Sequence, residues 1–129
     1  REPFRPFAPF LPEEEAARYF PDYPHPERSY PMRYMLTVGR WDQTLGQAVP
    51  AVNHLGTGRM QTVRREWNPR YYDLVSKFGE ATGVPVLMNT SYNLRGEPIV
   101  NTPANALRTF LNSGMDTLVI GNFIARKPN

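Results

Sequence analysis

The sequence contains no cysteine, and this absence excludes three kinds of chemistry. Disulfide bonds, thiolate zinc sites and thiol nucleophiles all need the missing side chain. A chain without cysteine fits a reducing compartment, which favours the cytoplasm. Long apolar runs are also missing, because no stretch approaches the ~20 residues that a membrane-spanning helix needs. The sequence therefore indicates neither a membrane protein nor a targeting segment.

A large surplus of charge is absent as well. The chain has 15 Lys and Arg against 12 Asp and Glu, for a formal net charge of +3. This surplus is compatible with an anionic ligand, but it is too small to indicate a nucleic-acid-binding protein. Aromatic residues make up 12% of the chain, which argues against disorder. We therefore expect a folded domain, and nucleic acid is not its expected partner.

Proline is abundant and unevenly distributed. More than half of the 14 prolines lie in residues 1–31. Each proline removes a backbone donor, so we expect no long helix and no central strand in this part. One short helix is expected from Pro12 to Phe20, and its three leading glutamates are interpreted as an N-terminal charge run. Residues 21–31 are predicted to be a surface loop, either a mobile flap or a connector.

The middle of the chain predicts short strands. Residues 34–38 are apolar and rich in β-formers, so we expect a strand there. Residues 39–48 are typical of a loop. Two further strands are expected over residues 49–54 and 59–63, with a hairpin-like turn at residues 55–58.

The C-terminal half predicts two capped helices. Asn68 and Pro69 open the first, and Gly83 ends it. Thr102 and Pro103 open the second, and Gly114 ends it. The expected strands are residues 84–88 and 117–120, with an extension at 122–125. Alternating helices and strands indicate the α/β class.

The 129 residues suffice for one domain rather than two. The chain starts at Arg1, in a segment typical of the interior of a longer protein. We therefore expect a single domain over residues 1–129 that is incomplete at its N-terminus. In it, residues 1–33 form a proline-rich part and residues 34–129 the α/β core.

Polar side chains follow the apolar strand over residues 84–88. Asn89, Ser91 and Asn93 alternate, so an extended chain would point all three to one side. Ligands in open α/β sheets bind at such a strand end. Amides and a hydroxyl suit a phosphate, ribose or carbamoyl ligand. The alternative is an ordinary capped turn, because Asn and Ser are common turn residues.

Three arginines and one histidine are further candidates. Arg1 and Arg5 are four residues apart, and Phe4 and Phe7 lie beside Arg5, where aromatic packing can orient an arginine towards an anion; the alternative is that both arginines are solvated. Arg59 follows the glycine turn, where a backbone can approach an anion closely. His54 is either a general base, an anion donor or a structural histidine. With His25 as the only other histidine, we expect no metal site within the chain.

Several segments together resemble one known family. They read REPFRPFAP, GTGRMQTV and GVPVLMNTSYNLRGEPIV, followed by TPANAL and LVIGNF. In this order, over nearly the whole chain, they resemble the C-terminal domain of the nodulation-type O-carbamoyltransferases. Members of that family carbamoylate Nod factors, aminoglycosides, cephems and aminocoumarins.

The resemblance implies a fold and an activity. The fold is that of threonylcarbamoyl-adenylate synthase, a twisted open mixed sheet with flanking helices. The implied activity converts carbamoyl phosphate and ATP to carbamoyl adenylate, with magnesium as a candidate cofactor. An upstream acceptor domain of the same protein, with an iron-type metal, would then transfer the carbamoyl group to a hydroxyl.

The resemblance also implies roles for particular residues. The implied catalytic residues are Arg5, Arg59 and Ser91, with Ser91 as a hydrogen-bonding residue rather than a nucleophile. The residues implied to bind nucleotide or carbamoyl phosphate are Arg1, Arg5, His54, Arg59, Asn89, Ser91 and Asn93. We expect them to converge on one concave site.

Two departures from the family pattern qualify these expectations. The family's upstream glycine-, arginine- and proline-rich stretch and a lysine are missing, and Arg1 would be the arginine of its K-x-R pair. Many members read H-V-D-G-T where this chain reads His54-Leu55-Gly56-Thr57. A magnesium- or ribose-binding role of that aspartate cannot operate here. We therefore expect little activity from this chain alone. The alternatives are a non-catalytic nucleotide-binding fragment and an RNA-binding module.

Overall fold

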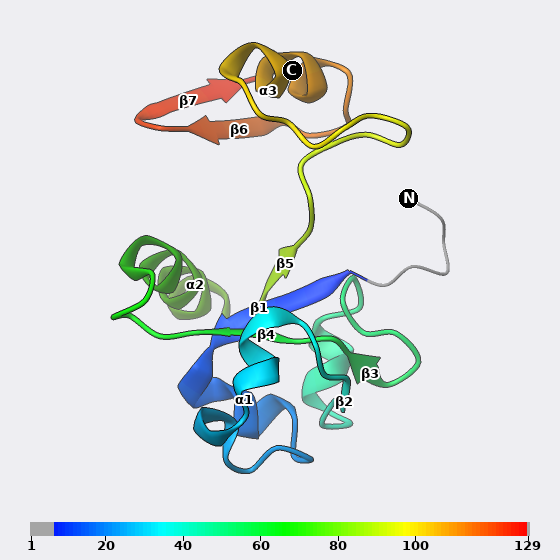
Figure 1. Cartoon of the computed structure of the whole chain (residues 1–129), viewed down its shortest axis with the longest axis vertical. Helices are drawn as coiled ribbons and strands as arrows, with labels where there is room; N and C mark the ends of the chain where they lie inside the picture. The colour runs from blue at the N-terminus through cyan, green and yellow to red at the C-terminus, as the bar shows by residue number, and fades with distance from the viewer. Residues whose placement is uncertain (1–6, 129) are drawn as a thin grey trace. The chain divides into compact units, whose positions relative to one another are not determined.

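A computed structural model describes residues 7–128 of the chain (Figure 1). The contacts divide them after Thr90 into a first unit of residues 7–90 and a second unit of residues 91–128, and each unit is described by itself. Helices and strands occur in both units, which confirms the α/β class. The expected organisation as a single domain stays a prediction.

The main sheet of the first unit has three strands, with β1 in the middle. β1 spans Ala8–Pro12, β4 spans Gln61–Val63 and β5 spans Leu87–Asn89. β1 runs parallel to β4 and antiparallel to β5, so the sheet is mixed, as predicted. β4 lies within the strand predicted over residues 59–63. β5 shares only residues 87 and 88 with the strand predicted over residues 84–88, because residues 84–86 are not in a strand.

The central position of β1 shows that the prediction of no central strand in the proline-rich part is wrong. β1 contains Pro9 and Pro12, whose nitrogen atoms carry no hydrogen to donate. β5 pairs with Ala8–Phe10 and β4 pairs with Phe10–Pro12, so each proline has a strand partner on one side of β1. On its other side each proline has no paired strand, as a residue on an edge strand does. The missing N–H of each proline is therefore tolerated in the middle strand of this sheet.

The sequence predicts three helices, and the structure confirms all three, although the third ends at Leu111 and not at the predicted Gly114. α1 spans Glu13–Tyr19, α2 spans Pro69–Thr82 and α3 spans Pro103–Leu111. The Asn68 side chain accepts a hydrogen bond from the Tyr71 amide at the start of α2, and Thr102 caps α3 in the same way. Gly83, with a φ of 78°, ends α2 in the left-handed conformation that glycine adopts without strain.

The predicted strand over residues 34–38 is wrong. Tyr30–Tyr34 form a short 3₁₀-helix, η2, and Met35 follows with a φ of 59°, which interrupts any extended run. Nearby, β2 (Gly39–Arg40) lies in the predicted loop and pairs antiparallel with β3 (Thr57–Gly58). Residues that favour strands do not form one without a partner strand to pair with.

The predicted strand over residues 49–54 is also wrong. The segment follows the 3₁₀-helix η3 (Leu45–Ala48) as turns, in which the Val52 amide donates to the Val49 carbonyl over 3.1 Å. Both valines are buried, so this apolar segment reaches the core through a turn instead of a strand. Another 3₁₀-helix, η1 (Pro26–Arg28), lies in the predicted proline-rich loop.

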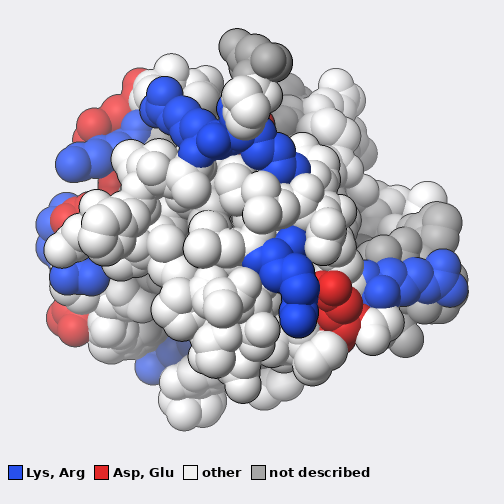
Figure 2. All heavy atoms as spheres, turned by 90° about the horizontal axis from the view of Figure 1, so that it is seen from above, with Lys and Arg blue, Asp and Glu red and all other residues white. Residues whose placement is uncertain are grey.

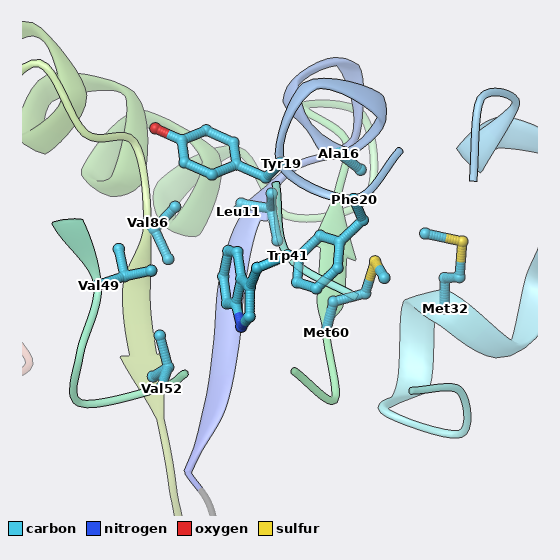
Figure 3. Close-up of a cluster of buried hydrophobic side chains, with 10 residues drawn as sticks. All are labelled: Leu11, Ala16, Tyr19, Phe20, Met32, Trp41, Val49, Val52, Met60 and Val86. Carbon is cyan, nitrogen blue, oxygen red and sulfur yellow. The ribbon is translucent and has the colours of Figure 1, made fainter. Parts of the chain in front are cut away.

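The larger core of the first unit gathers around Trp41 (Figure 3). The Trp41 ring lies 4.1 Å from the Phe20 ring between centroids, and Met60 packs in the same cluster. Two glycines allow the indole to fit, because a Cβ on Gly46 or Gly58 would approach Trp41 atoms to 2.7 Å and 2.8 Å. One function of these glycines is therefore to make room for Trp41.

The other face of the sheet is covered by α2. Phe10 and Val63 belong to one buried cluster with Val75 of α2, and Leu11, the neighbour of Phe10, belongs to the larger core. This division follows from the alternation of side chains along a strand. Residues far apart in the sequence therefore enclose the sheet on both faces.

Gly79→Ala is expected to destabilise the protein, although alanine is preferred over glycine in a helix by about 1 kcal/mol. A Cβ on Gly79 would lie 2.6 Å from the Pro85 Cβ and 2.9 Å from its Cα, so the backbone must shift. Overpacking of this kind costs about 1–3 kcal/mol. Urea unfolding measures the difference. The exposed neighbour Glu80→Ala is the control, with a change within about 0.5 kcal/mol. A more stable Gly79→Ala variant would contradict the close packing.

The second unit consists of α3 and a β-hairpin. β6 spans Thr117–Ile120, as predicted, and β7 spans Phe123–Arg126, close to the predicted extension. The two strands pair antiparallel, and Gly121 between them has a φ of 57°. Ala106 and Phe110 of α3 are buried. Across residues 7–128, no helix is long and apolar enough to cross a membrane.

Candidate functional site

The predicted glycine turn is a tight two-residue turn between His54 and Thr57. The His54 amide donates to the Thr57 carbonyl over 2.8 Å, and the reverse bond measures 3.0 Å. Leu55 and Gly56 occupy the turn with φ of 52° and 80°, as in type I′ hairpin turns. The Asn53 side chain accepts from the Gly56 amide over 2.9 Å. The turn is therefore held by its own hydrogen bonds.

Arg59 follows this turn as an exposed cation. Its neighbours Gly58 and Met60 are both buried, one against Trp41 and the other in the core, so the backbone is fixed on both sides of Arg59. Within residues 7–128 its guanidinium makes no ion pair or hydrogen bond. A guanidinium in this condition can bind a phosphate through two parallel hydrogen bonds.

Asn89 ends β5, and its side chain is paired with that of Gln61 at the start of β4. The Asn89 Nδ2 donates to the Gln61 Oε1. The Asn89 Oδ1 and the Gln61 Nε2 have no hydrogen bond to another residue of the described part. Sequence reasoning selects Asn89 but misses Gln61. The available signal is its position two residues after Arg59 in a predicted strand, because alternate residues share a face.

A cleft of about 400 Å³ adjoins this amide pair. Its wall includes the rings of Phe10, Tyr34, Trp67 and Tyr71. The Phe10 and Tyr71 rings meet edge to face, with centroids 5.4 Å apart. The wall of the cleft thus combines aromatic rings with the carboxamides of Gln61, Asn68 and Asn89.

A buried carboxylate, Glu13, binds Arg33 of the cleft wall and also Arg64. Glu13 is 5% exposed, and its Oε1 accepts from the Arg64 Nε over 2.5 Å, while its Oε2 lies 3.7 Å from the Arg33 Nε. Both guanidinium groups lie over the Trp67 ring, 4.1 Å and 4.8 Å from its centroid. The hydrogen bond to Glu13 raises the pKa of Arg64 above its ordinary value. The interpretation of Glu13 as part of an N-terminal charge run misses this cluster.

Ser91 and Asn93 follow β5 and belong to the second unit. Ser91 is exposed. The Asn93 Nδ2 donates to the carbonyls of Leu94 and Glu97 over 3.3 Å and 3.0 Å, and the Glu97 amide donates to the Leu94 carbonyl over 3.1 Å. Asn93 therefore closes a turn, which is the structural alternative for this segment, while its Oδ1 has no partner in the described part of the chain.

The structure places the other candidates as follows. Arg1 and Arg5 lie outside the described residues. The first unit holds His54, Arg59 and Asn89, and the second unit holds Ser91 and Asn93. Within the described part of the first unit, no hydrogen bond or ion pair joins the side chains of His54, Arg59 and Asn89 to one another. The convergence of the candidates on one site stays a prediction.

The described residues do not fit a magnesium site. Within residues 7–128, no group of three or more His, Asp or Glu side chains is arranged to hold a metal ion. Asp42, a carboxylate near the glycine turn, instead accepts hydrogen bonds from the amides of Thr44 and Leu45 over 2.9 Å and 3.0 Å.

Basic side chains occur in several separate groups on the face shown in Figure 2, and acidic side chains adjoin some of them. In the first unit, Arg40 pairs with Asp22 at 3.2 Å and Arg65 with Asp73 at 2.6 Å. The hydrogen bonds from Arg40 hold the pKa of Asp22 below its ordinary value. These pairs compensate part of the positive charge locally, whereas nucleic-acid binding uses unpaired cations along a surface.

The amino-acid sequence matches the family model described as Carbamoyltransferase C-terminus over residues 1–127. It is 42% identical over 128 residues to nodulation protein NolO of Bradyrhizobium diazoefficiens, covering 98% of this chain and 23% of that protein. It is 41% identical over 128 residues to nodulation protein NolNO of Sinorhizobium fredii, covering 98% of this chain and 18% of that protein. A protein of Amycolatopsis lactamdurans named 3′-hydroxymethylcephem-O-carbamoyltransferase is 35% identical over 123 residues, covering 95% of this chain and 22% of that protein.

The chain therefore spans between 18% and 23% of the length of these relatives. The family match includes both units and every candidate residue from Arg1 to Asn93. This chain belongs to the carbamoyltransferase C-terminus family.

Proposed function

We propose that this chain is the carbamoyl-activating part of an O-carbamoyltransferase. The observation that carries the proposal is the family match over residues 1–127, supported by a relative named for O-carbamoyl transfer to a cephem. Because the chain spans 22% of that relative, we place the acceptor-binding part in another domain of the same protein. The acceptor itself is not specified by these residues.

The proposed reaction starts from carbamoyl phosphate, which water cleaves to carbamate and inorganic phosphate. A carbamate oxygen attacks the α-phosphorus of ATP, the bond from that phosphorus to the bridging oxygen breaks, and carbamoyl adenylate and pyrophosphate form. In the acceptor domain, a hydroxyl oxygen attacks the carbamoyl carbon, loses its proton and releases AMP. Both substrates of the first stage are polyanions, so that stage needs cations and hydrogen-bond donors more than a nucleophile.

Within residues 7–128 the Arg59 guanidinium makes no ion pair, which supports this proposal, because it can bind phosphate oxygens without first breaking such a pair. We assign Arg5, Arg59 and Ser91 to the reacting groups. The side chains assigned to hold the nucleotide or carbamoyl phosphate are Arg1, Arg5, His54, Arg59, Asn89, Ser91 and Asn93.

The proposal places the reaction in the cytoplasm, because a chain with no cysteine fits a reducing compartment. Magnesium is proposed to enter bound to ATP, since residues 7–128 hold no carboxylate cluster for it. An iron-type metal is assigned to the acceptor domain, outside this chain.

Pyrophosphate release from carbamoyl phosphate and ATP tests the proposal. We expect release by the whole protein that contains this chain, and little release by the 129-residue chain alone, which spans about a fifth of its relatives. Omitting either substrate is the control. The proposal is wrong if the whole protein releases no pyrophosphate that depends on carbamoyl phosphate.

ATP binding without turnover is the second candidate function, favoured by the small share of its relatives that the chain spans. Equilibrium dialysis with ATP measures it directly. Binding by a whole protein that releases no pyrophosphate would support this candidate over the first. If the chain binds RNA, the affinity of the complex should fall steeply as the salt concentration rises. The small net charge of +3 does not favour an RNA-binding function.

A further inference from the structure

The main sheet of the first unit has an open edge at β5. The strand order is β4-β1-β5, so β5 has a partner strand on one side only. The opposite edge, β4, lies against η2, whereas β1 is the only described element that packs extensively against β5. The three residues of β5 include no charged residue and no proline, which are the residues that commonly protect an open edge from pairing. The edge of β5 is therefore free to pair with another strand.

The pairing of β5 with β1 shows which backbone groups face this edge. In an antiparallel pair, opposite residues that exchange two hydrogen bonds alternate with opposite residues that exchange none. Pro9 lies opposite Met88 and has no N–H to donate, so these two residues are of the second kind. Among the described residues, neither the N–H nor the C=O of Met88 has a partner outside the sheet. Both groups therefore point away from β1, towards the open edge.

An apolar groove lies beside this edge. Its volume is about 280 Å³, and it is lined by residues 48–52, by the last turns of α2 and by residues 84–88. Val52 is buried in it, while Phe78 and Met88 are 39% and 50% exposed. Thr82 is the only polar residue of its lining within residues 7–128, and no lining residue is charged. The groove therefore suits apolar side chains and offers no partner for a charged group.

The edge and the groove together match one mode of recognition, the addition of a strand to a sheet. In this mode the backbone of an extended segment pairs with an open edge, and its alternate side chains fill pockets beside that edge. Met88 contributes to both, because its backbone faces the edge and its side chain lines the groove. The groove is also smaller than the roughly 300–1,000 Å³ of small-molecule sites, which favours side chains over a free ligand.

A segment of the same polypeptide fits this edge better than a second copy of the chain. The chain spans 18% to 23% of the relatives NolO and NolNO, so about four fifths of each relative lies outside the matched region. A second copy would pair two edges of three residues each, which are too short to bury the roughly 1,200 Å² of a stable interface. A segment of the same polypeptide needs less area, because the covalent linkage gives it a high effective concentration.

We propose that an extended apolar segment of the same polypeptide, outside these 129 residues, adds a strand to the open edge of β5 and places its side chains in the groove. The added strand makes β5 an inner strand and removes an exposed edge that would otherwise favour aggregation. This interaction does not depend on carbamoyl chemistry, since it rests on the backbone of Met88 and on the apolar lining of the groove.

Photocrosslinking in the whole protein tests the proposal. A benzophenone amino acid is incorporated in place of Met88, and the crosslinked peptides are identified by mass spectrometry after irradiation. We expect a crosslink within one polypeptide to an apolar segment outside these 129 residues. The same probe at Glu80, an exposed position on α2 outside the groove, is the control and is expected not to label that segment.

Two substitutions that place a charge in the groove make the result specific. Ala51→Lys and Phe78→Lys change different segments of its lining. Each is expected to lower the crosslink yield from position 88 at least about tenfold, because an apolar segment would bury an unpaired ammonium group. Gln43→Lys adds the same charge at an exposed position outside the groove and is expected to leave the yield unchanged. Ala51→Lys keeps the proposal testable if Phe78→Lys does not fold, since Ala51 is exposed.

Hydrogen exchange resolved to single residues provides a second measurement. In the whole protein, the Met88 amide is expected to exchange slowly, because the added strand binds it. In the Ala51→Lys variant its exchange rate is expected to rise at least about tenfold. The amide of Leu87 faces β1 and is expected to stay slow in both proteins.

Several results would overturn the proposal. They are a crosslink to another part of residues 1–129 of the same chain, a crosslink between two copies, which doubles the mass, and the absence of any crosslink. A crosslink yield that both lysine variants leave unchanged would also overturn it. A Met88 amide that exchanges fast in the whole protein would show that no strand covers the edge.

Discussion

Arg59→Ala in the whole protein is expected to weaken ATP binding about tenfold to hundredfold and to leave the melting temperature nearly unchanged. The guanidinium is exposed and makes no ion pair within residues 7–128, so its removal should change stability by less than about 0.5 kcal/mol. A charge-assisted hydrogen bond to a bound phosphate is worth roughly 1.5–3 kcal/mol, which converts to the expected loss of affinity. Isothermal titration calorimetry and thermal unfolding measure the two quantities.

Two further variants make the Arg59 experiment specific. Arg59→Lys is expected to recover only part of the affinity, because an ammonium group cannot reproduce the planar fork of a guanidinium. Lys77→Ala removes the same charge from an exposed position on α2 and is expected to bind ATP normally. A large fall in melting temperature with unchanged affinity for Arg59→Ala would show that Arg59 has a structural role.

The helices could be predicted from the sequence because their ends carry local signals. Asn68 and Thr102 each cap a helix through the side chain that the sequence predicts, and a proline follows each of them. Gly83 ends α2 in the conformation expected of a C-terminal glycine. These signals act over a few residues, so no knowledge of the rest of the fold is needed.

The strands were harder to predict because a strand depends on its partner. Residues 34–38 contain β-formers, yet β1, with two prolines, is the strand that two others pair with. The stagger of β4 and β5 along β1 makes the prolines acceptable. It pairs residues that are 51 apart between β1 and β4, and 77 to 81 apart between β1 and β5. Composition within a short window does not contain this information.

Contacts between distant segments also limit what the sequence predicts about the candidate site. The exposure of Arg59 follows from its place after a glycine turn, which the sequence reveals. The pairing of Asn89 with Gln61 across β1, and the burial of Glu13 between two arginines, depend on contacts between distant segments. Sequence reasoning therefore identified an isolated cation more readily than groups that act in pairs.

Glu13→Gln is expected to destabilise the protein by about 2–3 kcal/mol. Glu13 is the buried counter-charge of two arginines that lie over the same indole ring. A glutamine of equal size would leave Arg33 without a negative partner among the described residues, and Arg64 with only the exposed Glu66, 3.5 Å away. Removing one member of a buried ion pair commonly costs about 3–5 kcal/mol. We expect less here, because the side chains of Arg33 and Arg64 are 21% and 33% exposed and water screens part of the loss. Urea unfolding followed by tryptophan fluorescence measures the change.

Glu15→Gln is the matched control for this variant. It removes the same charge from the first turn of the same helix, but Glu15 pairs only with the exposed Arg18, at 3.4 Å, among the residues that the structure describes. Any general effect of losing a negative charge near the start of α1 is therefore common to both variants. We expect Glu15→Gln to change stability by less than about 1 kcal/mol, as is usual for surface ion pairs. If both variants lose the same free energy of unfolding, the burial of Glu13 between Arg33 and Arg64 contributes nothing to stability. Glu13 would then act only as one more negative charge at the start of α1.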